Sequence, residues 1–193
     1  MKNYLILAFI TVVTIGTMNA QHVNFGFKVG LNLADVASDD NSETSLKPGL
    51  NVGVIGHIHL KNNFALQPEI SYSDQGAIFK SSGVESKLNL GYINVPVLLQ
   101  YMFDNGFRIQ AGPQVGILVN AKVKSNDVSI DVKDDLAVID FAISAGVSYV
   151  HPPTGFGVDA RYNVGLTNIN DEGNVNSTNR VIQVGVFYLL GHK

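Results

Sequence analysis

Cysteine is absent from this 193-residue chain. Its absence excludes a disulfide framework and a lipid anchor attached through cysteine. The chain also lacks an excess of basic residues, since 13 Lys and Arg stand against 16 Asp and Glu. Without a basic stripe along the sequence, we expect no nucleic-acid partner.

Long hydrophobic runs are missing after residue 20, although 46% of the chain is hydrophobic. The apolar runs there extend over only a few residues, whereas a membrane-spanning helix needs about 20. No helical period of apolar residues competes along this part of the chain either. Apolar residues that alternate with polar ones, rather than cluster, are typical of membrane β-barrels.

Residues 1–20 have the pattern of a secretory signal peptide. Lys2 is followed by an apolar stretch from Tyr4 to Ile15, and small Ala20 precedes Gln21. The apolar stretch is too short for a membrane anchor. We therefore predict cleavage after Ala20 and a single mature domain over residues 21–193.

The stretch Phe156–Thr167, FGVDARYNVGLT, shows the alternation most clearly. Every second residue from Phe156 to Leu166 is apolar, and the residues between are small, polar or charged. Side chains on a strand alternate between faces, so this is a strand with one apolar and one polar face. Its length suits a tilted crossing of a bilayer, which takes about 9–11 residues. The alternative is a soluble sandwich or a lipocalin-like barrel.

The same pattern recurs eight times, with connections that alternate between long and short. Short turns on one side and long loops on the other are typical of an outer-membrane barrel with both termini in the periplasm. The predicted long loops are 33–47, 74–87, 121–137, which could hold a short extra hairpin at 128–132, and 168–179. The predicted strands are Val23–Asn32, Pro48–Leu60, Phe64–Ser73, Leu88–Phe103, Phe107–Asn120, Val138–Val150, Phe156–Thr167 and Arg180–Leu190.

The hairpins agree with this assignment, because apolar faces match when Leu60 is paired with Phe64 and Phe103 with Phe107. A one-residue slip would swap the faces. Gly106 suits the left-handed position of the turn after Asp104. The sequence thus predicts an all-β, eight-stranded antiparallel up-and-down transmembrane barrel. Seven aromatic residues beside the short turns would form a girdle at the periplasmic interface: Phe64, Tyr101, Phe103, Phe107, Tyr149, Phe156 and Tyr188.

Six charged residues fall on the polar faces, and a barrel of eight strands is only wide enough for side chains to fill it. Three are positive and three negative, and buried charges need partners. We therefore predict a salt-bridged plug rich in Gln and Asn, with a narrow, gateable pore as the alternative. The predicted lumen charges are Lys28, Glu69, Arg108, Asp140, Asp159 and Arg161.

His57 and His59 are the weak candidates for a metal site, because two His side chains spaced this way on a strand can both reach one ion. No third ligand is evident at their depth, so packing in the lumen is the simpler interpretation, and we expect no cofactor. Catalysis would need a nucleophile with a base and an orienting group. No Ser is placed beside a His by the predicted strands, so we expect no enzymatic activity.

The four predicted loops carry twelve Asp and Glu against six Lys and Arg. Such an acidic crown could attract divalent cations or basic partners, but the simpler interpretation is a solvated surface. No calcium-loop motif is present. The expected partners are outer-membrane lipids and, through the long loops, other envelope proteins. Oligomeric state stays open.

Several segments together resemble the PorT-like outer-membrane β-barrel family over essentially all of residues 21–193. Asn94 departs from the acidic residue often found at its position. The segments are Phe25-Gly26-Phe27-Lys28-Val29-Gly30-Leu31-Asn32, Leu66-Gln67-Pro68-Glu69-Ile70-Ser71-Tyr72, Tyr92-Ile93-Asn94-Val95-Pro96-Val97-Leu98-Leu99, Ala111-Gly112-Pro113, Asp140-Phe141 with Gly146, and Ala160-Arg161-Tyr162-Asn163-Val164-Gly165-Leu166-Thr167-Asn168-Ile169.

The resemblance implies an outer-membrane barrel, exported to a Gram-negative envelope, with no catalytic residues to transfer. The member that names the family is associated with protein secretion by the type IX route, and many relatives lack that role. The expected function is therefore a structural, interaction or accessory component of the envelope. A small-solute or lipid-handling barrel and a membrane-embedded hydrolase are the alternatives.

Overall fold

The computed structural model describes residues 23–39, 44–81, 84–125, 128–170 and 176–191. The predicted signal peptide, residues 1–20, lies outside these ranges. Within them, no helix has both the length and the apolar character needed to cross a membrane. One short 3₁₀ turn, η2 (Lys133–Asp135), precedes the seventh strand.

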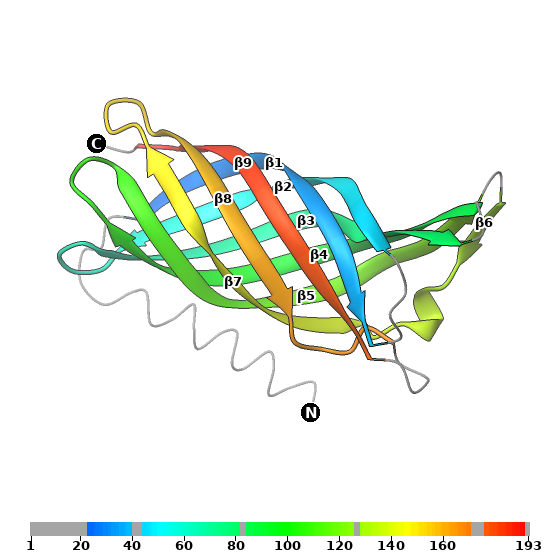
Figure 1. Ribbon diagram of the computed structural model, residues 1–193. Coiled ribbons are helices and arrows are strands. Elements are labelled where there is room, and N and C mark those ends of the chain that lie inside the picture. The colour runs from blue at the N-terminus through cyan, green and yellow to red at the C-terminus, as the bar shows by residue number, and fades with distance from the viewer. Residues whose placement is uncertain (1–22, 40–43, 82–83, 126–127, 171–175, 192–193) are drawn as a thin grey trace.

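The described strands form a single antiparallel sheet in the order β4-β3-β2-β1-β9-β8-β7-β5-β6. Because β4 also pairs with β5, the sheet closes on itself (Figure 1), and β6 lies outside the closed ring against the end of β5. The predicted eight-stranded barrel is confirmed. The strands are β1 (Val23–Ser38), β2 (Thr44–His59), β3 (Phe64–Ser81), β4 (Val84–Met102), β5 (Phe107–Ser125), β6 (Val128–Asp131), β7 (Ile139–Val150), β8 (Phe156–Gly165) and β9 (Ser177–Leu189).

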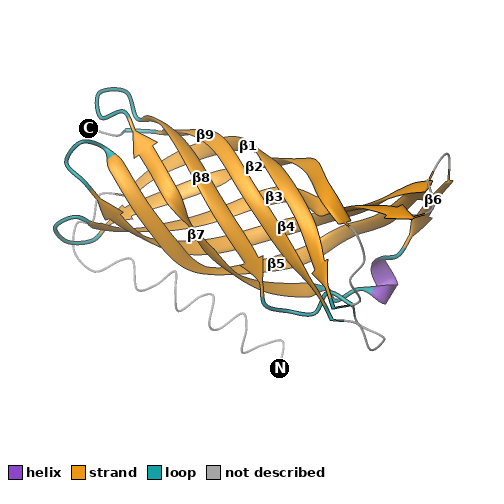
Figure 2. Ribbon diagram, viewed as in Figure 1, coloured by secondary structure: helices purple, strands orange, loops and turns teal. Residues whose placement is uncertain are grey.

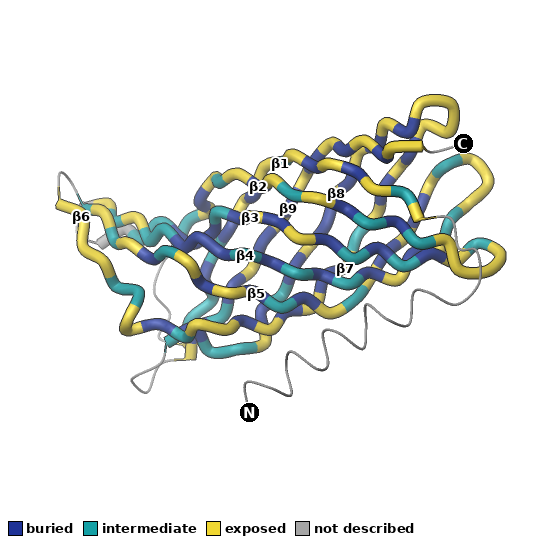
Figure 3. Tube along the Cα trace, turned by 180° about the vertical axis from the view of Figure 1, so that it is seen from behind, coloured by how far each residue is buried: buried dark blue, intermediate teal, exposed yellow. Residues whose placement is uncertain are grey.

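Burial alternates along each barrel strand (Figure 3), as strand geometry requires. On β9, Gln183 and Phe187 are buried, whereas Val184 and Val186, which lie between them in the sequence, are exposed. The outward face is therefore apolar and the middle of the inward face is polar. A lipocalin-like or sandwich fold would have the opposite arrangement, so the soluble alternative is wrong.

The three short turns and the C-terminus lie at one end of the barrel (Figure 1). Both predicted hairpin pairings are confirmed: the Leu60 amide donates to the Phe64 carbonyl at 2.9 Å, and the Phe103 amide donates to the Phe107 carbonyl at 2.8 Å. Gly106 has the predicted left-handed conformation, with φ of 89°, which a residue with a side chain adopts only at a cost.

At the opposite end, which we call the mouth, the strands continue well past their predicted ends. The predicted loops 33–47, 74–87 and 121–137 are largely strand, and the short hairpin expected at 128–132 is present as β6. The apolar alternation stops where the outward apolar belt ends, but backbone pairing does not depend on it. Alternation therefore located the belt and missed the extension that β3, β4 and β5 form beyond it (Figure 2).

This extension changes the interpretation of the predicted acidic loops. Lys122 and Lys124 lie on β5, Asp35 lies on β1, and Lys47 and Asp74 lie on β2 and β3. These charges are held on paired strands rather than on loops. The prediction that these charges lie on loops is therefore wrong for most of residues 33–47, 74–87 and 121–137. In the fourth predicted loop, residues 171–175 lie outside the described ranges.

The outward belt makes a prediction that a matched pair of valines can test. Val184 lies midway along the outward row of β9 and Val128 lies on β6, with exposed fractions of 55% and 61%. We expect Val184→Arg to destabilise the folded barrel by about 2–4 kcal/mol, because the charge would enter the bilayer midplane. Val128→Arg should change stability by about 0.5 kcal/mol or less. Urea titration of the lipid-reconstituted protein, read by the mobility of the unheated protein on a gel, measures both. Equal costs would contradict a lipid-facing belt.

Candidate functional site

The strongest interaction inside the barrel joins Arg161 on β8 to Glu69 on β3. Arg161 Nη1 donates to Glu69 Oε2 at 2.8 Å, and Nη2 donates to Oε1 at 2.5 Å. Both residues are only 4% exposed. Four steps around the ring separate β8 from β3, which is half the circumference. This bidentate ion pair therefore spans the lumen from wall to wall.

A second ion pair is connected to the first through β8. Asp159 and Arg161 are two residues apart, so both point inward. Lys28 on β1 donates to Asp159 Oδ2 at 2.5 Å, and Arg161 Nε lies 2.8 Å from the same oxygen. The four charged side chains form one neutral, buried cluster. Bidentate, charge-assisted pairing offsets the cost of taking these charges out of water.

Amide side chains extend the cluster toward the short-turn end. Gln67 donates to Glu69 at 2.6 Å, and Gln100 donates to Gln67 at 2.8 Å and to Gln110 at 2.7 Å. On the other side, Lys28 donates to Gln183 at 2.9 Å. The lumen charge cluster thus sits within a Gln-rich network, as the polar inward faces predicted.

Arg108 and Asp140, the other two predicted lumen charges, do not join the cluster. Both are buried, but Arg108 contacts His57 and Gln100 at 3.4 Å rather than a carboxylate. Asp140 accepts a hydrogen bond from Asn179 at 2.9 Å and forms no ion pair with a described residue. The expectation that all six charges pair is therefore wrong. On neighbouring strands β5 and β7, Arg108 is eight residues from Gly116, the register partner of Asp140, so the two charges are too far apart to meet.

Two clusters of buried apolar side chains lie inside the barrel, one toward each end of the polar cluster, and the sequence analysis predicted neither. The sequence contains a sign of the mouth layer, because Leu90 and Leu118 are apolar residues at inward-facing positions. The base layer, at the short-turn end, consists of Ile55, Val150, Phe187 and Leu189. The mouth layer consists of Val36, Ala77, Leu90, Tyr92, Leu118, Ala121, Leu136 and Ile169.

Residues outside the barrel strands complete the mouth layer. Leu136 follows η2, and Ile169 lies between β8 and β9. The Ala137 amide donates to the Ile169 carbonyl at 2.9 Å, which ties these two connections together. In the base layer, Gly157 leaves room for the Phe187 ring, since a Cβ there would lie 2.3 Å from it. Each layer therefore depends on a specific local fit.

A further ion pair that the sequence did not suggest lies nearer the mouth. Lys47 on β2 is buried and its Nζ lies 2.9 Å from Asp74 Oδ1 on β3. Both residues were assigned to loops because the apolar alternation had ended before them. They meet at the break in the β2–β3 register between Leu46 and Asn51, where Lys47 still pairs with Ala34 on β1 and Asp74 with Gly91 on β4.

The two candidate metal ligands, His57 and His59, differ in their exposure to solvent. His57 is buried beside Arg108, whereas His59 is exposed at the rim of the barrel. His59 shares the inward face with His57, since its register partner Ala65 is buried, but it is not packed inside the lumen. Across the part of the chain that the structure describes, no three His, Cys, Asp or Glu side chains are grouped as metal ligands.

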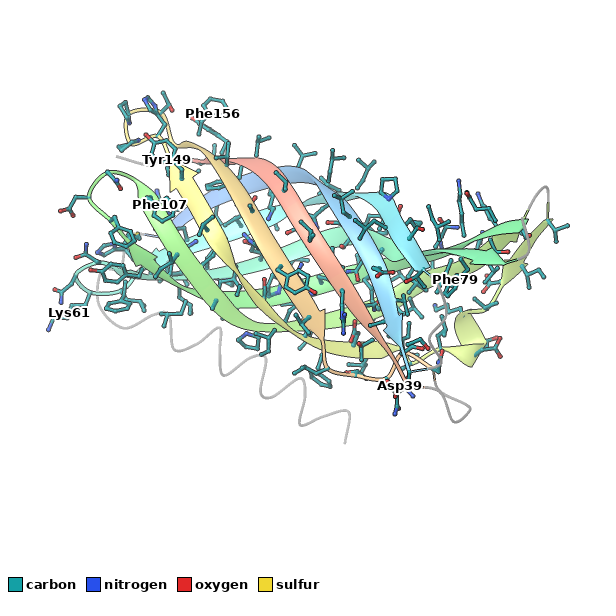
Figure 4. The ribbon with its side chains drawn as sticks, viewed as in Figure 1. Asp39, Lys61, Phe79, Phe107, Tyr149 and Phe156 are labelled. Atoms are coloured by element: carbon teal, nitrogen blue, oxygen red, sulfur yellow. The ribbon has the colours of Figure 1, made fainter. Side chains whose placement is uncertain are left out.

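The seven predicted girdle aromatics are all exposed on the outer surface near the short turns. Figure 4 shows Phe107, Tyr149 and Phe156 at that end, away from Phe79 and Asp39. Phe64 and Tyr101 meet edge to face with ring centroids 5.3 Å apart, and Phe156 and Tyr188 are 4.8 Å apart. The rings form a band where an interface with lipid headgroups is expected.

The two buried arginines provide a matched test of the cluster. Arg161→Gln leaves Glu69 buried without its cation, so we expect a loss of about 3–5 kcal/mol in unfolding free energy. Arg108→Gln removes a cation that pairs with no carboxylate, and its cost should be about 1 kcal/mol or less. Urea unfolding in lipid vesicles measures both variants. Similar losses would show that Arg161 does not hold the lumen together.

Comparison with known proteins adds independent information. A search of the curated proteins found no match. Among solved structures, the chain is similar to the Neisserial surface protein A, with 15% identity, a TM-score of 0.57, and coverage of 86% of this chain and 98% of that one. It is also similar to Ail, the attachment invasion locus protein of Yersinia pestis, with 18% identity, a TM-score of 0.50 and the same coverage. These likenesses show a shared fold.

The model of one protein family, described as outer membrane protein beta-barrel domain, matches residues 19–171. That match covers most of the chain, including β1 to β8 and the four residues of the lumen charge cluster. The protein therefore belongs to the outer-membrane β-barrel domain family and is a barrel of the Gram-negative outer membrane.

Proposed function

We propose that this protein is a closed, non-enzymatic barrel that acts as an interaction or accessory component of the envelope, through the surface it presents beyond the lipid. The observation that carries this proposal is the Arg161–Glu69 pair across the lumen. A side-chain bridge halfway round the ring leaves no straight path for a solute in a barrel of this size.

The apolar layers strengthen the argument against passage. An ion that entered from the mouth would first meet Leu90, Leu118 and Ile169, all buried. At the other end it would meet the base layer. A channel lining of this kind does not hold water, because apolar cavities stay dry. The closed lumen therefore argues against the narrow-pore and small-solute alternatives.

Catalysis inside the barrel lacks an activated nucleophile among the described residues. Ser144 and Ser148 face the lumen, but neither hydroxyl hydrogen-bonds to a described group. A serine nucleophile needs a base within hydrogen-bond reach. This geometry supports a non-enzymatic role.

The extension beyond the mouth supplies the surface through which we propose that the protein acts. In Figure 2 the ends of β4 and β5, with β6, project past the barrel. Val128 and Ile130 on β6 are about 60% exposed, although they lie outside the lipid belt. Lys122 and Lys124 line a hollow of about 460 Å³ on this extension. Apolar and charged groups together suit a protein partner better than a solute.

The finer assignment, to the PorT-like family with an accessory role in protein secretion, is supported by the resemblance of the quoted segments. Arg161 and Glu69 both lie inside those segments, so the resemblance includes the bridge across the lumen. Under this assignment the partner at the extension would be a component of the secretion machinery.

Conductance measurements test the closed lumen directly. In planar bilayers we expect the purified protein to give no steady current, because the cluster and both apolar layers block the path. The double variant Arg161→Ala with Glu69→Ala keeps both apolar layers, so it should also give no steady current if it still folds, as checked by gel mobility. A steady current from the unaltered protein would overturn the closed-barrel proposal.

Cross-linking tests the interaction surface. Because the chain has no cysteine, an introduced cysteine supplies the only thiol of each variant. Val128→Cys on β6 and Lys61→Cys in a short turn place single thiols at opposite ends of the barrel (Lys61 is labelled in Figure 4). In intact cells we expect a defined adduct with another envelope protein from Val128→Cys alone. Adducts from Lys61→Cys alone would move the interaction to the periplasmic end.

A further inference from the structure

Asp140 is a buried carboxylate that pairs with no cationic side chain among the described residues. It lies on β7, points into the lumen and is 6% exposed. Its Oδ2 accepts a hydrogen bond from Asn179 Nδ2 at 2.9 Å, while its Oδ1 has no partner among the described groups. Burying an ionised carboxylate in this state is costly unless a positive charge lies nearby.

Asn179, which donates a hydrogen bond to Asp140, also carries a buried oxygen without a described partner. Asn179 uses its amide hydrogens on Asp140 and on the Tyr92 hydroxyl at 3.3 Å, which leaves its Oδ1 buried and unpaired. Unpaired acceptors beside an uncompensated carboxylate attract a positive charge.

Backbone pairing brings one more oxygen to the same place. Gly116 on β5 is the register partner of both Asn94 on β4 and Asp140 on β7. A Cβ on Gly116 would lie 2.8 Å from Asn94 Oδ1 and 3.5 Å from the Asp140 carbonyl oxygen. Tyr92 Cδ1 would lie 3.2 Å from the same Cβ, so the missing side chain of Gly116 leaves room for the Tyr92 ring and the Asn94 amide on the inward face below Leu118.

We infer that Asp140 holds a monovalent cation, Na⁺ or K⁺, in the lumen together with amide oxygens of Asn94 and Asn179. One carboxylate supplies a single negative charge, so a divalent ion would leave an uncompensated positive charge in the barrel. Hard cations of this kind prefer carboxylate and amide oxygens. The site lies outside the charge cluster and does not depend on the proposed interaction function.

The mouth layer covers this site. Tyr92, which contacts Asn179, and Leu118, one inward position above Gly116, both belong to that layer, and Leu136 and Ile169 lie across it. An ion held beneath an apolar cover exchanges slowly with solvent. It would therefore act as a structural ion that fixes β7 to β9 and β4.

Thermal unfolding of the full-length protein, purified from outer membranes into detergent, tests this inference. At constant ionic strength, NaCl or KCl should raise the midpoint above that in N-methylglucamine chloride, by about 5–10 °C at a hundredfold excess over Kd. Asp140→Asn keeps the side-chain shape and should abolish the difference. Asp131→Asn on exposed β6 is the matched control and should retain it. The same midpoint in all three salts for the unaltered protein, or an unchanged difference in Asp140→Asn, would overturn the site.

A second variant keeps the test informative if Asp140→Asn fails to fold. Asn179→Asp adds a second carboxylate beside the first and should shift the stabilising ion from Na⁺ or K⁺ toward Ca²⁺. In crystals grown with rubidium chloride, anomalous density should lie beside Asp140 Oδ1. Crystals without that density, together with an infrared band of a neutral carboxyl that Asp140→Asn removes, would show that a proton takes the place of the ion.

Discussion

The bidentate ion pair between Arg161 and Glu69 joins opposite walls of the barrel across the lumen. A barrel wall needs no core, because the backbone ladder closes the ring. The interior must nevertheless be filled, and its polar groups must be satisfied without bulk water. A guanidinium can do this at long reach, since its fixed fork matches a carboxylate and its charge offsets the opposite charge. Asp159 and Gln67 contact the two members of this ion pair, and Lys28 contacts Asp159.

The two apolar layers fill the parts of the lumen on either side of the ion pair. Charged side chains in a low-dielectric space interact strongly because water is kept away. The mouth layer and the base layer place apolar side chains toward the two ends of the charge cluster. Leu136 and Ile169 come from connections rather than strands, so part of the mouth layer is built by segments that the barrel itself does not require. The closed lumen that we propose would leave the outer surface and the extension as the parts available for interaction.

The sequence predicted the structure correctly where apolar and polar residues alternate at every second position along a strand. The outward belt, the three short turns, the register at Leu60 and Phe103, and the left-handed Gly106 all follow from local rules. It failed at the mouth, where strands leave the lipid and the apolar alternation that marked them stops. It also failed for pairing inside the lumen. Arg108 and Asp140 share the polar face with Arg161 and Glu69, and nothing local distinguishes them.

The sequence by itself determined the class of fold, the direction in which each strand faces and the residues that line the lumen, because strand geometry alternates side chains whatever the rest of the chain does. Only the tertiary structure decided which charges meet. Strand tilt and the closure between β4 and β5 set the depth of every inward side chain and the strand that lies opposite. Through them Arg161 reaches Glu69, whereas Asp140 accepts a hydrogen bond from the Asn179 amide and pairs with no described cation.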